Sequence, residues 1–289
     1  MPDKNWSTSY NETDNSKLRK LQLIELDLLK IFNDICEKYH LRYILCGGTI
    51  LGAIRHKGFI PWDDDLDVAM PRPDYEKFAN IVREELGSRY QFLSFKTDES
   101  YHRNFNRIVD TKVIVHNASN SKELLECAWL DIFPLDGMPN NKISQMIHFW
   151  RMTFKRFLFH ASCFEEMVNL NRPGRPWYQQ AAIKFLSATH FGSKMNTIKL
   201  MSSIEKGLKK YDYDKGKWIV SFFGSYMTKE IFEKRLIGNG TKYQFENLML
   251  YGPDLYDEFL SHFYGDYMKV PPDAQKDKHN ITEIEYLDN

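Results

Sequence analysis

An acidic segment that runs straight into an alternating apolar stretch constrains this chain more than any other feature. Residues 63–67 read Asp-Asp-Asp-Leu-Asp, and every second side chain of the stretch that follows is apolar. A repeat of two is typical of a β-strand, whose successive side chains point to opposite faces. The pattern therefore predicts a strand over residues 65–70 in which Asp65 and Asp67 share the face opposite the core.

Two carboxylates on one strand face point to a bound cation. Packing like charges so closely on a buried strand is costly unless a cation offsets them. Mg²⁺ and Mn²⁺ suit oxygen ligands, and they neutralise charge on the attacking and leaving oxygens of a phosphoryl transfer. A solvated loop or a helix cap would explain a lone Asp-x-Asp pair, but not four acids within five residues that continue into an apolar strand.

A glycine pair precedes these acids and predicts a phosphate-binding turn. The apolar residues 43–46 predict a short buried strand, and Gly47-Gly48 would then form a tight turn before a helix over residues 50–56. Backbone amides of such a turn, together with those of the following helix N-terminus, can donate to a phosphate. We therefore expect Gly47, Gly48 and Thr49 to bind substrate.

Three basic side chains stand between the glycines and the acids. Arg55, His56 and Lys57 would lie near an anionic ligand that the acids hold through a metal. Arg55 and Lys57 also fit the description of surface charges. We expect Arg55 and His56 to bind phosphate.

A second acidic segment, residues 130–137, reads Leu-Asp-Ile-Phe-Pro-Leu-Asp-Gly. Its first acid, Asp131, is flanked by apolar residues as in a strand. It therefore offers a third carboxylate, either for the metals or for deprotonating an acceptor hydroxyl. Asp136 precedes Gly137 and is predicted to be a turn residue.

The remaining patterns predict a mixed α/β, or α+β, core with an appended helical lobe. Apolar residues at steps of three and four predict an amphipathic helix over residues 16–39, with Glu25 among its polar positions. The other predicted elements are helices over 74–86 (capped by Asp74), 142–164, 177–191 and 253–264, and strands near 90–95, 105–109, 113–116, 129–133, 222–224 and 243–245. A polar tail begins at Pro271. We divide the chain into a catalytic core (16–138), a helical lobe (139–215) and a C-terminal part (216–289) that packs back on the core.

Composition narrows the classes of function. The 39 basic residues balance the 39 acidic ones, so no overall field recruits nucleic acid or an anionic membrane. The four cysteines are widely spaced, which favours reduced core thiols over a zinc site or a disulfide scaffold. The chain has no apolar leader and no run of about 18 apolar residues. We therefore expect a cytoplasmic protein.

Residues 46–67, which carry both the glycines and the acids, resemble the signature of the LicD family. Residues 131–136 and 263–268 also resemble later motifs of that family, and a proline pair follows the second of them. The similarity extends from Leu18 to about His279.

The resemblance implies a polymerase-beta-like nucleotidyltransferase fold and transfer of phosphocholine from CDP-choline to a sugar of a bacterial surface glycan. By position, Asp65 and Asp67 match the family's metal-binding pair, Asp63 an accessory acid and Asp131 the third carboxylate. Mg²⁺ or Mn²⁺ is the implied cofactor, and the acceptor would be part of a teichoic acid, lipopolysaccharide or capsule. Two departures stand out: the stretch from Gly48 to Asp65 is longer than in typical nucleotidyltransferases, and the zinc element of the fukutin-related proteins is absent.

Other functions stay open at this point. Relatives, including the fukutin-related proteins, transfer other phosphorylated alcohols such as ribitol phosphate, and glycerol phosphate is a further candidate. An ordinary nucleotidyltransferase would instead move the nucleotide and release pyrophosphate. A degenerate transferase acting as a scaffold is disfavoured, because Gly47, Gly48, Asp65, Asp67 and Asp131 are all present.

Residues 143–162 interleave aromatic with basic side chains and allow two interpretations. Acceptors of LicD-like enzymes are often assembled on lipid carriers at the inner membrane face, so this helix could rest among headgroups beside its substrate. Alternatively, it is a core helix of the lobe whose long basic stems extend past the aromatic rings. The core-helix interpretation is favoured, because aromatic residues at helical spacing usually pack inside.

Overall fold

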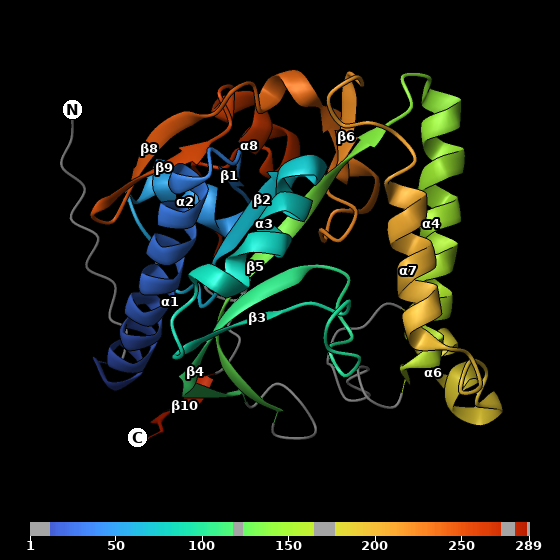
Figure 1. The fold of residues 1–289 in the computed structure, drawn as a ribbon, viewed down its shortest axis with the longest axis horizontal. Helices are drawn as coiled ribbons and strands as arrows, with labels where there is room; N and C mark the ends of the chain where they lie inside the picture. Colours follow the sequence, from blue (N-terminus) through green and yellow to red (C-terminus); the bar gives the residue numbers. More distant parts are fainter. Residues whose placement is uncertain (1–11, 118–123, 165–176, 273–280, 288–289) are drawn as a thin grey trace.

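The computed structural model describes residues 12–117, 124–164, 177–272 and 281–287. It is a mixed α/β structure built on an eight-stranded sheet and a separate two-stranded hairpin. The predicted fold class is therefore confirmed. Figure 1 shows the sheet at the centre, with a pair of long helices set to one side of it.

The main sheet follows the order β1-β2-β5-β4-β10. β2 and β5 run parallel, and the other pairs are antiparallel. The strands on this path are β1 (Ile44–Leu45), β2 (Asp67–Pro71), β5 (Leu124–Met138), β4 (Asn106–Asn117) and β10 (Ile281–Tyr286). Shorter strands extend it: β3 (Tyr90–Leu93) pairs with β4, β6 (Trp218–Val220) with β5, and β7 (Ile231–Glu233) with β6. β5 thus joins β2, from the first part of the chain, and β6, from the last part, into one sheet.

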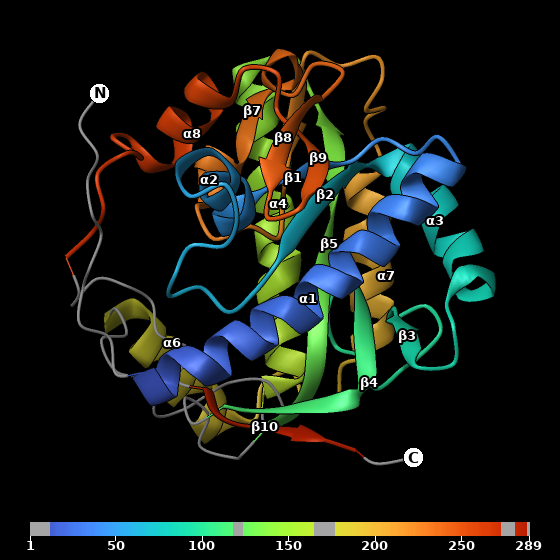
Figure 2. The ribbon, with the colours of Figure 1, turned by 90° about the vertical axis from the view of Figure 1, so that its left-hand side faces the viewer.

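The first helix covers this sheet with an apolar stripe. α1 (Glu12–Lys38) buries Leu21, Leu28 and Phe32 completely. It lies across β4 and β5 and beside α3 (Figure 2). The other helices are α2 (Gly47–Arg55), α3 (Arg72–Glu85), α4 (Lys142–Ser162), α6 (Trp177–Thr189), α7 (Thr197–Leu208) and α8 (Tyr256–Tyr264), with short 3-10 helices η1 (Met227–Glu230) and η2 (Lys234–Leu236).

α4 and α7 form a second core away from the main one. Phe149 and Met152 of α4 pack with Met201 and Ile204 of α7. This cluster continues to β6 and β7 through Val220 and other apolar side chains. The β8–β9 hairpin (Thr241–Phe245 and Leu248–Gly252) packs instead on the main core, beside α2 and β1. Within the described ranges, no helix is both long and apolar enough to cross a membrane.

Several sequence predictions about elements are wrong. The strands expected at 105–109 and 113–116 are one strand, β4, whose register shifts between Asp110 and Ile114. Residues 222–224 form a turn, and the strand of that region is β6. α7 and β10 were missed. β10 lies within the expected polar tail, and it forms because the free edge of β4 pairs with it.

Two acids lie differently from expectation. Asp74 is not the N-cap of α3, because the helix begins at Arg72 and Asp74 accepts a hydrogen bond from Arg42 Nε at 2.7 Å. Asp136 is not a turn residue: it lies in β5, is 1% exposed, and binds Arg72. All four cysteines are free thiols; Cys36 and Cys163 are buried, and the other two half-buried.

The Arg72–Asp136 pair ties α3 to β5 in the interior. Arg72 Nε and Nη2 donate to the two Asp136 oxygens, both at 2.6 Å, and Arg72 Nη1 lies 3.6 Å from Glu205 of α7. The pair therefore links the main sheet to the helical lobe. Removing one partner leaves the other charge buried, which is far costlier than losing an exposed pair.

We expect Asp136→Ala to lower the free energy of unfolding by about 3–5 kcal/mol, because Arg72 would keep its charge without its main partner. Urea denaturation measures this. The matched control is Glu258→Ala, which breaks an exposed pair with Arg235 and should cost no more than about 1 kcal/mol. Equal losses in the two variants would contradict the importance of the buried pair.

Candidate active site

A cavity of about 410 Å³ lies between the start of β2 and the C-terminal part of the chain. Asp63, Asp65 and Asp67 line one side of it, together with Gly47 and Gly48. The other side comes from residues 221–232 and from α8. Both predicted glycines and three of the four predicted acids therefore face one common space, whereas Asp131 does not line it.

The backbone around Asp67 is held at both of its polar groups. Its N–H donates to Thr49 Oγ1 at 2.8 Å, and its carbonyl accepts from Cys46 N–H at 3.1 Å. Thr49 is 3% exposed and does not line the cavity. Its hydroxyl therefore positions the strand that carries Asp67, while a direct role in phosphate binding stays a prediction.

Gly47 and Gly48 open α2 directly, so the separate turn expected before the helix is wrong. Gly47 has a φ of 57°, and a Cβ there would lie 2.6 Å from Asp67 Oδ2. A Cβ on Gly48 would lie 2.3 Å from Asp63 Oδ2. Both glycines are needed because acidic side chains lie directly against the backbone. Their binding of phosphate is not tested by this geometry.

The acids gather closely enough to share a cation. Carboxylate oxygens of Asp63, Asp64 and Asp65 lie within 4.8 Å of one another. Asp64, which we did not single out in the sequence, is 4% exposed and completes this group. The expected strand is shorter at its start, since β2 begins only at Asp67. Asp65 therefore sits in the extended segment before the strand rather than in it.

Asp67 carries the electrostatic consequence of this crowding. Burial, followed by the charges of Asp65, Asp131 and Asp63, holds the pKa of the Asp67 carboxyl well above its usual range. A cation between these groups would relieve both effects. The donors are all hard carboxylate oxygens, which fits Mg²⁺ or Mn²⁺ and does not suit a soft metal.

Asp131 lies beside Asp67, as its register partner on the parallel strand β5. The partner of Asp131 was not predicted from the sequence. Arg107 of β4 binds both Asp131 oxygens, with Nη2 at 3.2 Å from Oδ2. The Arg107 guanidinium also lies 4.7 Å from the ring centre of Trp129. Asp131 is therefore held firmly next to the acids. If Asp131 binds a metal or accepts a proton, it does so while it is paired with Arg107.

Arg55 and His56 do not line the cavity. Arg55 donates from Nε to His56 Nε2 at 2.9 Å and from Nη1 to the Tyr267 carbonyl at 3.0 Å. Burial, and then the charge of Arg55, lowers the pKa of His56 to about 4. His56 is therefore neutral at pH 7 and supplies no positive charge there. Phosphate binding by these two residues stays a prediction.

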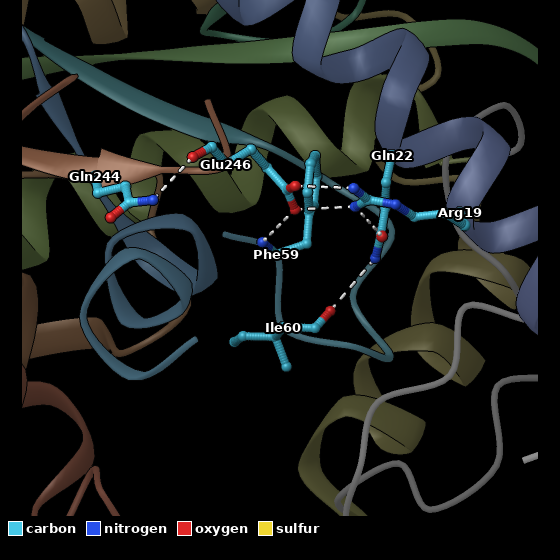
Figure 3. A network of polar contacts seen from close by, with 6 residues as sticks. All are labelled: Arg19, Gln22, Phe59, Ile60, Gln244 and Glu246. Carbon is cyan, nitrogen blue, oxygen red and sulfur yellow. Dashed lines mark hydrogen bonds and ion pairs between the residues drawn. The ribbon is translucent and has the colours of Figure 1, made fainter. Parts of the chain in front are cut away.

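A network from α1 fixes the loop that leads to the acids (Figure 3). Arg19 binds both Glu246 oxygens, at 2.9 and 2.8 Å. One turn further along α1, Gln22 Nε2 donates to the carbonyls of Ile60 and Asp63, at 3.4 and 2.9 Å. The α1 helix therefore holds the loop just before the acidic cluster through Gln22, and it is itself bound to the β8–β9 hairpin through Arg19 and Glu246.

Glu25 lies one turn further along the same helix and is wholly buried, so its expected polar position is wrong. Neither of its carboxylate oxygens has a hydrogen-bond partner within the described ranges. Burial, followed by the charges of Asp65, Asp64, Asp63 and Asp131, raises its pKa well above the usual value. Burial beside these acids therefore disfavours the charged form of Glu25.

A larger cleft of about 760 Å³ lies next to this cavity, and the two share Ile44 and Leu135. Two of its cations already have partners: Arg42 binds Asp74 and Asp214, and Lys234 binds two backbone carbonyls. We place the candidate active site at the smaller cavity, because the acids line it.

A mixed sheet, a helix that opens on glycines, and acids gathered at a strand start define a nucleotidyltransferase type of protein. Residues 40–172 match the family model described as LicD/FKTN/FKRP, nucleotidyltransferase domain. The chain is also 34% identical over 282 residues to the lipopolysaccharide cholinephosphotransferase LicD of Haemophilus influenzae, covering 93% of this chain and 98% of that one. The chain belongs to the LicD family.

Two further relatives come from Rickettsia. An uncharacterized protein of Rickettsia prowazekii is 26% identical over 189 residues, covering 63% of each chain. One of Rickettsia typhi is 26% identical over 200 residues, covering 67% of this chain and 56% of that one.

We expect Gly48→Ala to weaken binding of Mn²⁺ by about tenfold or more, because the new methyl group would push the Asp63 carboxylate out of the acidic group. Titration calorimetry with the metal alone measures this. The matched control is Gly87→Ala, where a Cβ meets no atom within 4 Å. Unchanged Mn²⁺ affinity in Gly48→Ala would argue against Asp63 as a ligand.

Proposed function

We propose that this protein transfers phosphocholine from CDP-choline to a sugar hydroxyl of a bacterial cell-surface glycan and releases CMP. The observation that carries the proposal is the acidic group of Asp63, Asp65 and Asp67 on one side of the cavity. The similarity to a lipopolysaccharide cholinephosphotransferase supports the choice of donor and acceptor. The acceptor would be a teichoic acid, a lipopolysaccharide or a capsule, built in the cytoplasm or at the inner face of the membrane.

In the proposed reaction, the acceptor oxygen attacks the phosphorus that bears choline. The bond from that phosphorus to the bridging oxygen breaks, and CMP leaves with the electron pair. In this proposal Asp131, which is bound by Arg107, would receive the proton of the hydroxyl. Asp65 and Asp67, with Asp63, would hold Mg²⁺ or Mn²⁺, which neutralises charge on the phosphate oxygens when bound. Gly47 and Gly48 line the same cavity and would present backbone to that phosphate.

Two alternatives keep the same site. The transferred group would be ribitol phosphate or glycerol phosphate in the first. In the second, an ordinary nucleotidyltransferase reaction moves the nucleotide and releases pyrophosphate. Product analysis with a panel of CDP-alcohols separates them, because CMP release with a phosphorylated glycan supports the proposal and pyrophosphate release from a nucleoside triphosphate contradicts it.

We expect Asp65→Asn and Asp67→Asn to lower kcat by at least about 1,000-fold, since metal stabilisation of the transferred phosphate supplies several kcal/mol. A chelator should abolish turnover of the wild type, and added Mg²⁺ or Mn²⁺ should restore it. CMP release measures each effect.

Asp34→Asn is the control for these variants, because Asp34 is an exposed acid of α1 far from the acids in sequence. Near wild-type turnover in either site variant would sink the metal-site assignment. Asp131→Ala should lower kcat as well, whereas an effect on KM alone would make Asp131 a substrate contact.

We propose that the exposed face of α4 rests on an anionic membrane surface, beside a lipid-linked acceptor. The core-helix interpretation explains one face only, where Phe149 and Met152 are buried. A second apolar stripe is exposed along the same helix: Ile143 (71%), Ile147 (59%), Trp150 (52%), Phe154 (61%) and Phe157 (38%).

The charge of α4 favours an anionic surface. The helix contains no acidic residue, and it carries Lys142, Arg151, Lys155 and Arg156. Exposed apolar patches of this kind mark interaction surfaces, and basic side chains beside them favour anionic headgroups. Lys155 Nζ also donates to Ser203 Oγ at 2.8 Å, so that lysine contributes to the contact with α7.

We expect the protein to sediment with vesicles that contain anionic lipid at low salt. Trp150→Ser combined with Phe154→Ser and Arg151→Glu should release it without lowering Tm, because all three side chains are exposed. Met249→Ser, which removes an exposed apolar side chain from β9, is the control. If the wild type stays in the supernatant, the membrane contact is excluded.

A further inference from the structure

Aromatic rings line the same cavity as the acids. We call Phe223, Tyr226, Phe263 and Tyr264 the aromatic wall, and all four line the cavity. The Tyr226 ring lies 5.8 Å from Phe263 and 5.6 Å from Tyr264, measured between centres, and its plane is at 85° to that of Tyr264. Tyr226 is nevertheless 41% exposed. The wall therefore offers ring surface that the protein itself leaves uncovered.

A buried carboxylate lies beside this wall. Glu230 lines the same cavity and is 5% exposed. Its Oε1 accepts from the Tyr226 N–H at 3.0 Å. Within the described ranges, no lysine or arginine lies at ion-pairing distance from it. Gly224 crosses directly over the carboxylate, since a Cβ there would lie 2.0 Å from Oε1.

This environment is costly for an ionised acid. Burial raises the pKa of the Glu230 carboxyl to about 7, against the lowering effects of the Tyr226 N–H and of the more distant Arg156. A cation in the cavity would offset that cost and favour the ionised form. Such a cation would also lie against the faces of the aromatic wall.

The combination suits one kind of cation in particular. A quaternary ammonium group cannot donate a hydrogen bond, and proteins recognise it with aromatic faces and a nearby negative charge. Ribitol and glycerol are neutral polyols, which would need hydrogen-bond partners in place of a wall of rings. A metal ion would favour the carboxylates that gather at Asp63, Asp64 and Asp65.

We propose that the aromatic wall and Glu230 bind the trimethylammonium group of the donor's choline. This inference rests on the proposed function and adds the residues that select the alcohol. The reacting phosphate would then lie toward Asp65 and Asp67, which line the same cavity. The two sides of the cavity would each hold one end of phosphocholine.

Binding measurements on the purified protein test this assignment. We expect Tyr226→Leu and Glu230→Gln each to raise the Kd of CDP-choline by about tenfold, since a cation–π contact contributes about 1–2 kcal/mol. The Kd of CMP, which lacks choline, should change less than about twofold. Tyr226→Phe, which keeps the ring face, should restore most of the lost affinity. Tyr286→Leu, at an exposed tyrosine of β10, is the control for folding and Tm.

A second comparison uses the wild type with several donors. CDP-choline should bind more tightly than CDP-ethanolamine, whose ammonium group is more strongly hydrated and lacks the methyl groups that would cover the rings. Tyr226→Leu should reduce that preference, whereas Glu230→Gln should weaken the binding of both donors, because each carries one positive charge. Because Glu230→Gln preserves shape and Tyr226 is partly exposed, retained Tm in either variant makes its result interpretable.

Three results would overturn the assignment, and they are distinguishable. If wild-type protein releases CMP from CDP-choline but both variants keep the wild-type ratio of affinities, the choline site is elsewhere while the proposed function stands. If CDP-ribitol or CDP-glycerol is the preferred donor, phospho-alcohol transfer stands without choline. If no CDP-alcohol yields CMP with any candidate glycan, the proposed function fails and the choline site fails with it.

Discussion

Repulsion among buried carboxylates is the constraint on which the rest of the site depends. Asp67 is half-buried next to Asp65 and Asp131, and the wholly buried Glu25 lies within range of the same charges. Such an arrangement persists only because the surrounding backbone is fixed from several sides. Arg107 supplies one internal positive charge, and the α1 network holds the loop that carries the first acids. Part of the free energy of folding therefore offsets the repulsion between these like charges, which is typical of a site that receives a cation.

The site residues could be predicted from the sequence where the alternation of apolar residues and the type of side chain both indicated a functional position. The alternation around Asp67 predicted that Asp65 and Asp67 would face the cavity. The glycines were singled out as a phosphate-binding turn, and the structure adds that nothing larger fits beside the acids. Glu25 was placed wrongly, because helical periodicity cannot show that a polar position packs over a neighbouring charged loop. Arg107 and Glu230 were missed for a related reason: each acquires its meaning from a partner far along the chain. The lengths of β4 and β5 were also predicted wrongly, because pairing in the sheet decides where these strands end.

The cavity is assembled from two distant parts of the chain. One side comes from residues 46–69, which carry the family signature, and the other from residues 221–264. The sheet brings them together, because β5 pairs with β2 along one stretch and with β6 just beyond it. This division separates two tasks. In the proposed reaction, the first part would bind phosphate and metal, which are common to the reaction class, and the second would contact the group being transferred.

The pairing of β5 also has a consequence during synthesis on the ribosome. Residues 106–138 emerge early, but the neighbours that complete their sheet include β6 at 218–220 and β10 at 281–286. The Arg19–Glu246 ion pair, which supports the loop before the acids, likewise cannot form until Glu246 has left the ribosome. Non-local pairings of this kind slow folding and expose strand edges until their partners arrive. The nascent chain therefore carries an unfinished sheet edge for most of its translation, and a chaperone that shields that edge would act on β4.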